Sequence, residues 1–190
     1  MNITDDHTRQ AQLIRCIPDI TDYRTLLYIG ANCNRMQMIP LFLSAGYVID
    51  VVEVFRPNWQ GLVKLNEASK IFRNIIHADI REYKTEELYD IVMWWHGPEH
   101  ADYVSMVKVV RYLESLATKY VVLACPWGEY KQNAVGNNIY EEHLQSLSIE
   151  DFTIYGYQVD TIGKKDTTGS NLIAWKKKEI DHESDSCKGS

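Results

Sequence analysis

A short apolar run that ends in a glycine is the feature that most constrains this chain. Residues 26–29 are long enough for a buried strand and too short for a helix, and Gly30 follows them. A helical segment comes next, and a second apolar run, residues 47–52, ends at the carboxylate of Glu53. This order is the first half of a nucleotide-binding βαβ unit, in which the glycine turn faces the charged part of a ligand and the acid accepts hydrogen bonds from ribose hydroxyls.

The rest of the chain continues the alternation of strand and helix. The apolar segment Tyr89–Trp95 is typical of a strand that is covered on both faces. Further strands are predicted at residues 74–78, 120–124, 152–161 and 171–178, with a polar hairpin loop between the last two. We therefore predict an α/β fold with a doubly wound, Rossmann-like, seven-stranded sheet. Six strands should be parallel and the last antiparallel, with helices on both faces.

The helices are predicted from apolar spacing and from the positions of prolines. A proline inside a helix removes a hydrogen bond, so Pro40 leaves two alternatives: the second helix begins near it or is kinked there. The predicted helices are residues 5–16, a segment within 34–45, a short segment from Pro57, residues 98–117 and residues 138–147.

Composition sets the class of protein. With 190 residues, 45% of them hydrophobic and 24% charged, the chain is expected to form one domain over residues 1–178, followed by a disordered tail at 179–190. The net charge is −6 and no basic face is evident, so we expect no DNA partner. No apolar run approaches the roughly 20 residues that cross a bilayer. The cysteines show no paired spacing and the N-terminus is unlike a signal peptide, so a cytoplasmic protein with no membrane partner is expected.

Four segments carry reactive groups at expected strand ends. They are Y-I-G-A-N at 28–32, the acid Glu53, H-A-D-I at 77–80 and D-I-V-M-W-W-H-G-P-E-H at 90–100. Taken in this order, they resemble the motifs of class I S-adenosylmethionine-dependent methyltransferases, and the resemblance covers residues 25–178. The first segment departs from the family pattern, because an acid is usual where Tyr28 stands and glycines are usual at Asn32 and Asn34.

The resemblance implies that S-adenosyl-L-methionine is the cofactor. The backbone at 28–32 would turn around its amino-acid part, Glu53 would bind the ribose hydroxyls, and Asp79 would contact the adenine amino group. A tryptophan face attracts a sulfonium cation, which favours Trp95 as a wall of the pocket. Two structural alternatives remain, an ion pair between Glu53 and Arg56 and a helix cap at Asp79. The expected cofactor-binding residues are Tyr28, Gly30, Ala31, Asn32, Glu53, Val54, Asp79, Ile80 and Trp95.

The end of the fourth predicted strand holds the densest group of reactive side chains. Histidine can take a proton from a hydroxyl or an amine, so we predict His96 or His100 as the base, with Glu99 beside them. These three residues could instead hold a divalent metal, but the sequence favours a site without metal. The loop after the fifth strand is expected to bind the substrate through Trp127, Tyr130, Tyr140, Glu142 and His143.

Two absent motifs narrow the function. No (D/N/S)-P-P-(Y/F) segment follows the fourth strand, which argues against methylation of DNA bases. No G-x-G-x-x-G segment follows the first strand, which disfavours a nicotinamide-dependent oxidoreductase. The sequence therefore predicts methyl transfer to a small-molecule or sugar-type acceptor at oxygen or nitrogen. The alternatives are a non-catalytic protein that binds S-adenosylmethionine and, less favoured, the oxidoreductase.

Overall fold

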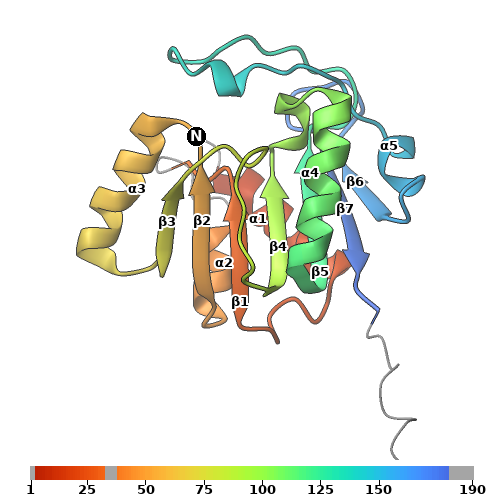
Figure 1. Cartoon of the computed structure of the whole chain (residues 1–190). Helices are drawn as coiled ribbons and strands as arrows, with labels where there is room; N and C mark the ends of the chain where they lie inside the picture. The colour runs from red at the N-terminus through yellow and green to blue at the C-terminus, as the bar shows by residue number, and fades with distance from the viewer. Residues whose placement is uncertain (1–2, 33–37, 180–190) are drawn as a thin grey trace, which may run out of the picture.

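The computed structural model describes residues 3–32 and 38–179. These residues form one seven-stranded sheet with helices packed against it (Figure 1). The strand order is β3-β2-β1-β4-β5-β7-β6. β7 is antiparallel to both neighbours and all other pairs are parallel, so the predicted sheet of six parallel strands and one antiparallel strand is confirmed. The strands are β1 (Thr25–Ile29), β2 (Val48–Glu53), β3 (Asn74–His77), β4 (Tyr89–Trp95), β5 (Ala117–Cys125), β6 (Gln158–Ile162) and β7 (Asn171–Lys177).

Helices pack on both faces of the sheet, because strand side chains alternate between two apolar cores. Leu27 enters the core that α4 covers, whereas Leu26 enters the core that α1, α2 and α3 cover. The helices and 3₁₀ turns are α1 (Ile3–Cys16), α2 (Ile39–Ser44), α3 (Arg56–Ser69), η1 (Pro98–His100), α4 (Tyr103–Leu116), η2 (Ile139–Glu141) and α5 (Glu150–Thr153).

Pro40 lies in the first turn of α2, so the first of its two alternatives is correct. A first-turn residue needs no backbone N–H within the helix, and the fixed backbone angle of proline suits that position. The earlier part of the predicted segment, including Asn34, lies outside the described residues. The predicted tail beyond residue 179 also lies outside them.

The predicted helix at 98–117 is wrong in one respect, because it is divided in two. Pro98–His100 form the separate turn η1, and α4 begins at Tyr103. Asp102 caps α4: its side chain accepts a hydrogen bond from the backbone N–H of Ser105 at 3.0 Å. Glu99 and His100 therefore lie on a short turn of their own at the end of β4.

The predicted helix at 138–147 is also wrong, since only the turn η2 forms there. Backbone N–H groups in this segment bond to distant carbonyls instead of to their own helix. Leu144 donates to the carbonyl of Glu99 and His143 to that of Gln132, each at 2.9 Å. The predicted strand at 152–161 likewise begins late, because α5 occupies its first residues and β6 starts at Gln158.

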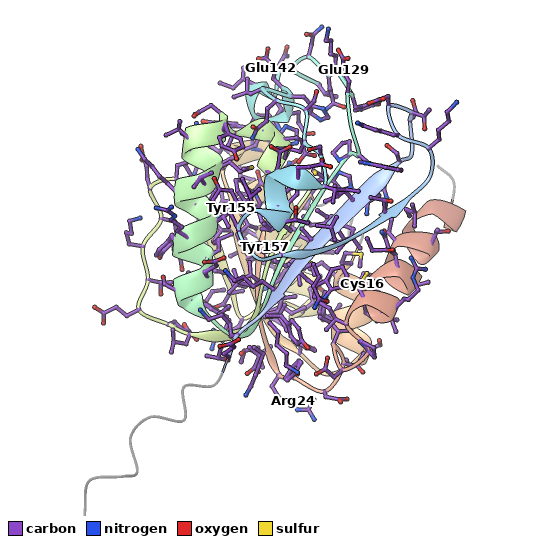
Figure 2. All side chains as sticks on the ribbon, turned by 90° about the vertical axis from the view of Figure 1, so that its right-hand side faces the viewer. Cys16, Arg24, Glu129, Glu142, Tyr155 and Tyr157 are labelled. Carbon is purple, nitrogen blue, oxygen red and sulfur yellow. The ribbon has the colours of Figure 1, made fainter. Side chains whose placement is uncertain are left out.

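The segment between β5 and α5 lies over the carboxyl ends of the parallel strands (Figure 1). In Figure 2, Glu129 and Glu142 of this segment lie at the opposite end of the molecule from Arg24, which precedes β1. Within the described residues, no helix combines the length and apolar character that crossing a membrane requires. The covering segment therefore closes over the edge of the sheet where an open α/β fold binds its ligands.

Candidate active site

Gly30 forms the turn that follows β1. Its φ of +82° is a left-handed conformation that side chains disfavour, and its N–H donates to the carbonyl of Val52 at 2.9 Å. The backbone is therefore bare where β1 and β2 end side by side. Gly30 lines both cavities described below, so a ligand in either can lie against main chain.

The first of these, the strand-end cavity, has a volume of about 100 Å³. It lies where β1, β2, β3 and β4 end, with Gly30, Glu53 and Asp79 in its wall, because these strands are parallel neighbours in the sheet. Its lining residues are Ile29, Gly30, Val52, Glu53, Val54, Asn58, Ala78, Asp79, Ile80, Arg81, Trp94, His96, Gly97, His100, Ala101, Asn138, Tyr140 and Glu141.

Glu53 is a buried acid with few partners in this cavity. It is 5% exposed, and its Oε1 accepts a hydrogen bond from the N–H of Phe55 at 2.7 Å. Burial raises the pKa of Glu53 to about 7, and the charge of Glu141 raises it further. Among the described residues no ion pair joins Glu53 to Arg56, so the structural alternative from the sequence is not realised. The carboxylate is left able to accept hydrogen bonds from a ligand.

Asp79 has a partner of its own. Its carboxylate pairs with the guanidinium of Arg81 and accepts the backbone N–H of the same residue at 2.9 Å. Burial raises the pKa of Asp79, but the bonds from Arg81 outweigh that effect and the pKa is lowered. No helix begins at this residue, so Asp79 is not the helix cap considered above. A ligand amino group would have to share this carboxylate with Arg81.

His96 has a strained backbone directly after β4. Its φ is +49°, and its N–H donates to the carbonyl of Ala124 at 2.8 Å. Strain of this kind in a residue other than glycine is concentrated at functional sites. Gly97 permits the turn, because a Cβ there would lie 1.8 Å from the indole nitrogen of Trp94. The imidazole Nδ1 lies 3.3 Å from Oε1 of Glu99, and Nε2 is buried without a hydrogen-bond partner among the described residues.

Glu99 is the buried centre of a group of three histidines. The residue is 2% exposed, and its Oε1 lies 3.8 Å from Nε2 of His100 as well as within reach of His96. Burial raises the pKa of Glu99, but the hydrogen bond from His96 and the charge of His100 outweigh it and lower the pKa. The rings of His100 and His143 approach with centroids 4.9 Å apart. Tertiary structure therefore brings the side chains of Glu99 and His143, which are far apart in sequence, close together.

The second cavity, the histidine cavity, is larger, with a volume of about 270 Å³. It shares Gly30, His96, His100 and Glu141 with the strand-end cavity, so the two adjoin. Its lining residues are Arg9, Tyr28, Gly30, Asn32, Trp95, His96, Glu99, His100, Pro126, Tyr130, Gln132, Glu141, His143, Thr167, Thr168, Gly169 and Ser170.

The two cavities divide the predicted cofactor residues between them. Gly30, Glu53, Val54, Asp79 and Ile80 line the strand-end cavity. The other predicted cofactor residues in a cavity wall line the histidine cavity, and they are Tyr28, Asn32 and Trp95. Ala31 is 3% exposed, belongs to the core and lines neither cavity.

The predicted substrate residues also divide. Tyr130 and His143 line the histidine cavity, and Tyr140 lines the strand-end cavity. Trp127 packs against the core under α4, and its carbonyl accepts a hydrogen bond from Ser170. The exposed Glu142 contributes its backbone carbonyl, 3.0 Å from Nδ1 of His100, and its side chain lines neither cavity.

Several lining residues escaped the sequence prediction. Trp94 lines the strand-end cavity, whereas the predicted Trp95 lines the histidine cavity. The alternation of side chains along a strand, which sends neighbours to opposite faces, was the signal for Trp94. Arg9 had no such signal. It reaches the histidine cavity because α1 is held against the antiparallel edge, where Gln12 bonds to Asp160 at 3.1 Å and to Asn171 at 3.0 Å.

The fold can now be compared with known proteins. No protein-family model and no curated protein matches the sequence. Magnesium protoporphyrin IX methyltransferase from Synechocystis PCC 6803 has a TM-score of 0.62 at 14% identity, over 92% of this chain and 78% of that chain. The N-methyltransferase NodS from Bradyrhizobium japonicum WM9 has a TM-score of 0.64 at 12% identity, over 93% and 97%. The methyltransferase domain of a bacterial Hen1 protein has a TM-score of 0.62 at 14% identity, over 90% and 98%.

These similarities extend over nearly the whole of this chain. The strand order and the antiparallel β7 agree with them. The protein therefore has the fold of class I S-adenosylmethionine-dependent methyltransferases, as the order of its sequence motifs predicted.

Proposed function

We propose that the protein binds S-adenosylmethionine and transfers its methyl group to a small-molecule or sugar-type acceptor. The observation that carries this proposal is the pair of adjoining cavities, which share Gly30, His96 and His100. One has acids at strand ends, which suit an adenosine, and the other has histidines, which suit a proton-bearing acceptor. Cofactor and acceptor would then meet at the shared wall.

Charge favours this cofactor over a dinucleotide. The described residues that line the strand-end cavity include the acids Glu53, Asp79 and Glu141, and the one arginine among them, Arg81, is already paired with Asp79. These acids would repel a phosphate, whereas a ribose diol, an adenine amino group and a sulfonium suit them. Some structural neighbours were crystallised with S-adenosylmethionine or S-adenosylhomocysteine bound, which supports the same ligand here.

The side chains of this protein would bind the two substrates and move one proton. When bound, the cofactor would supply a methyl group on a sulfonium leaving group. Glu53 would accept hydrogen bonds from the ribose hydroxyls. His96 would donate its Nδ1–H to Glu99, which leaves Nε2 free to take the proton that the acceptor oxygen or nitrogen loses as it bonds to the methyl carbon. Positioning of the acceptor in line with the methyl is the larger contribution.

Isothermal titration with S-adenosylhomocysteine and, separately, with NAD tests the cofactor. We expect binding of one S-adenosylhomocysteine per chain and none of NAD at the same concentration. Tight binding of NAD without S-adenosylhomocysteine would overturn the proposal. Transfer is tested by incubating the protein with S-adenosylmethionine carrying a labelled methyl group and a panel of hydroxyl- and amine-bearing small molecules. Binding without transfer to any of them would favour the non-catalytic alternative.

A further inference from the structure

Three side chains at the wall of the histidine cavity converge as metal ligands do. Glu99, His100 and His143 each offer one ligand atom, and these atoms all lie within 4.8 Å of one another. Glu99 and His100 come from η1, whereas His143 comes from the segment that covers the sheet edge. The sequence favoured a site without metal and grouped Glu99 and His100 with His96, so it could not show this set.

The two histidines are oriented as metal-binding histidines are. Nδ1 of His100 lies 3.0 Å from the carbonyl oxygen of Glu142, and Nδ1 of His143 lies 2.5 Å from that of Tyr130. A carbonyl oxygen only accepts, so Nδ1 of each ring carries a hydrogen, and Nε2 is the ring nitrogen that remains for a metal ion. A backbone carbonyl bound to the other ring nitrogen is the usual support of a metal-ligating histidine.

The carboxylate of Glu99 also keeps a free ligand atom. Its Oε1 faces Nδ1 of His96, while Oε2 is buried and has no hydrogen-bond partner within residues 3–32 and 38–179. Leaving an oxygen of a buried carboxylate unpaired is costly, and a cation would remove that cost. His96 would then be the hydrogen-bonding group that orients the ligating carboxylate of Glu99.

From this geometry we propose that Glu99, His100 and His143 form a binding site for one divalent first-row transition metal ion. Metal–ligand bonds of about 2.0–2.2 Å place tetrahedral ligands roughly 3.5 Å apart. The ligand atoms of the three residues all lie within 4.8 Å of one another, so side-chain movements of about 1 Å would complete the site. Two imidazoles and one carboxylate suit Zn²⁺ or Mn²⁺ and disfavour Mg²⁺ and Ca²⁺, which prefer oxygen ligands.

Three protein ligands leave a coordination position open towards the histidine cavity. Resting on the proposed function, we assign that position to the acceptor atom that receives the methyl. A hydroxyl bound to the ion would lose its proton more readily, and His96 lies beside it to take that proton. An acceptor with an ionisable hydroxyl is therefore favoured over one with an amine.

The test is metal binding itself. Protein freed of metal by a chelator is titrated with ZnCl₂, MnCl₂ and MgCl₂ by calorimetry, and Co²⁺ is added separately to record its visible absorption. We expect one Zn²⁺ per chain at this site, tighter than Mn²⁺ and much tighter than Mg²⁺. Glu99→Gln and His143→Ala should each weaken Zn²⁺ binding at least about tenfold, since even groups that only orient a ligand have effects of that size.

His77→Ala is the matched control. Nε2 of His77 also contacts a carbonyl oxygen, that of Val54 at 3.1 Å, but His77 is not one of the converging ligands. Its Zn²⁺ affinity should equal that of the wild type. Equal affinity in wild type and His143→Ala, or no binding of any transition ion to the wild type, would overturn the proposal. His143 is half-buried, so His143→Ala tests the site even if Glu99→Gln fails to fold.

The outcome is separable from that of the proposed function. Titration of the same metal-free samples with S-adenosylhomocysteine reports on cofactor binding independently of the metal. Normal S-adenosylhomocysteine binding without metal binding would reject the metal site and leave the cofactor proposal standing. Metal binding without S-adenosylhomocysteine binding would reject the cofactor proposal and leave the metal site standing.

Discussion

The strand-end cavity and the histidine cavity adjoin, yet they are built in different ways. Much of the first is formed by residues at or just beyond the ends of regular strands, such as Glu53, the last residue of β2, and Asp79, two residues beyond β3. The second is formed by short turns and a long irregular segment, which bring Glu99 to His143 across 44 positions of sequence. Regular strands fix one half of the site, and tertiary hydrogen bonds fix the other. A ligand for the first half can be inferred from its motifs, whereas the chemistry of the second half follows from contacts.

The largest expected effect lies in the histidine cavity. If His96 is the base, His96→Ala should lower turnover by about 10²–10⁴-fold, the usual contribution of proton transfer to a positioned side chain. S-adenosylhomocysteine affinity should stay within a few-fold, because a lost base acts on the transition state. Steady-state rates with an identified acceptor and calorimetric titration give the two quantities. His100→Ala, measured alongside, separates the two candidate bases, and full rate in both variants would remove histidine from the proton transfer.

The next effect lies in the strand-end cavity. Glu53→Ala removes a charged acceptor of hydroxyl hydrogen bonds, and a net loss equivalent to one such bond is typically about 1.5–3 kcal/mol. S-adenosylhomocysteine should bind on the order of tenfold to several hundredfold more weakly by calorimetry. Glu67→Ala, an exposed glutamate on α3, is the control and should leave the affinity unchanged. Equal affinity in wild type and Glu53→Ala would place the ribose elsewhere.

A smaller effect should appear with pH. Burial raises the pKa of Glu53 to about 7, and the ribose hydroxyls need its ionised form. S-adenosylhomocysteine affinity should therefore fall up to about tenfold between pH 8 and pH 6, and Glu53→Gln should abolish this dependence. An affinity that is the same at both pH values in the wild type would show that Glu53 does not titrate on binding.

The same raised pKa has a consequence for the unliganded protein. The protonated acid is favoured in the folded state, so its contribution to stability is full below about pH 4.5 and is lost as the pH rises through about 7. Thermal melts of the wild type should thus lose stability across this window relative to Glu53→Gln. The two curves should differ most above pH 7, and parallel curves would contradict the raised pKa.

The smallest effect concerns Arg81. The side chains of Asp79 and Arg81 are 21% and 44% exposed, so their ion pair is worth about 1 kcal/mol or less. Arg81→Ala should free Asp79 for an adenine amino group and tighten S-adenosylhomocysteine binding by no more than about fivefold, measured by calorimetry. Tenfold weaker binding would instead show that Arg81 contacts the ligand itself, which would reopen the case for a phosphate-bearing cofactor.

The sequence by itself determined the parts of this protein that depend on local pattern. Apolar runs of four to seven residues predicted strands β1 to β5, since residues buried on both faces of a parallel sheet need no alternation. The position of Pro40 restricted α2 to two alternatives. The glycine at position 30 and the acids at 53 and 79 could be placed at one sheet edge, because the carboxyl ends of parallel strands lie together.

Tertiary structure decided what depends on contacts between distant segments. The region 138–147 has helical spacing, but its backbone N–H groups bond to the carbonyls of Glu99 and Gln132, so it crosses the sheet edge as an irregular segment. This segment brings His143 close to Glu99. Arg9 reaches the histidine cavity only because Gln12 anchors α1 to the antiparallel edge. No local pattern contains these partners, since a hydrogen bond between residues far apart in sequence is set by the packed fold.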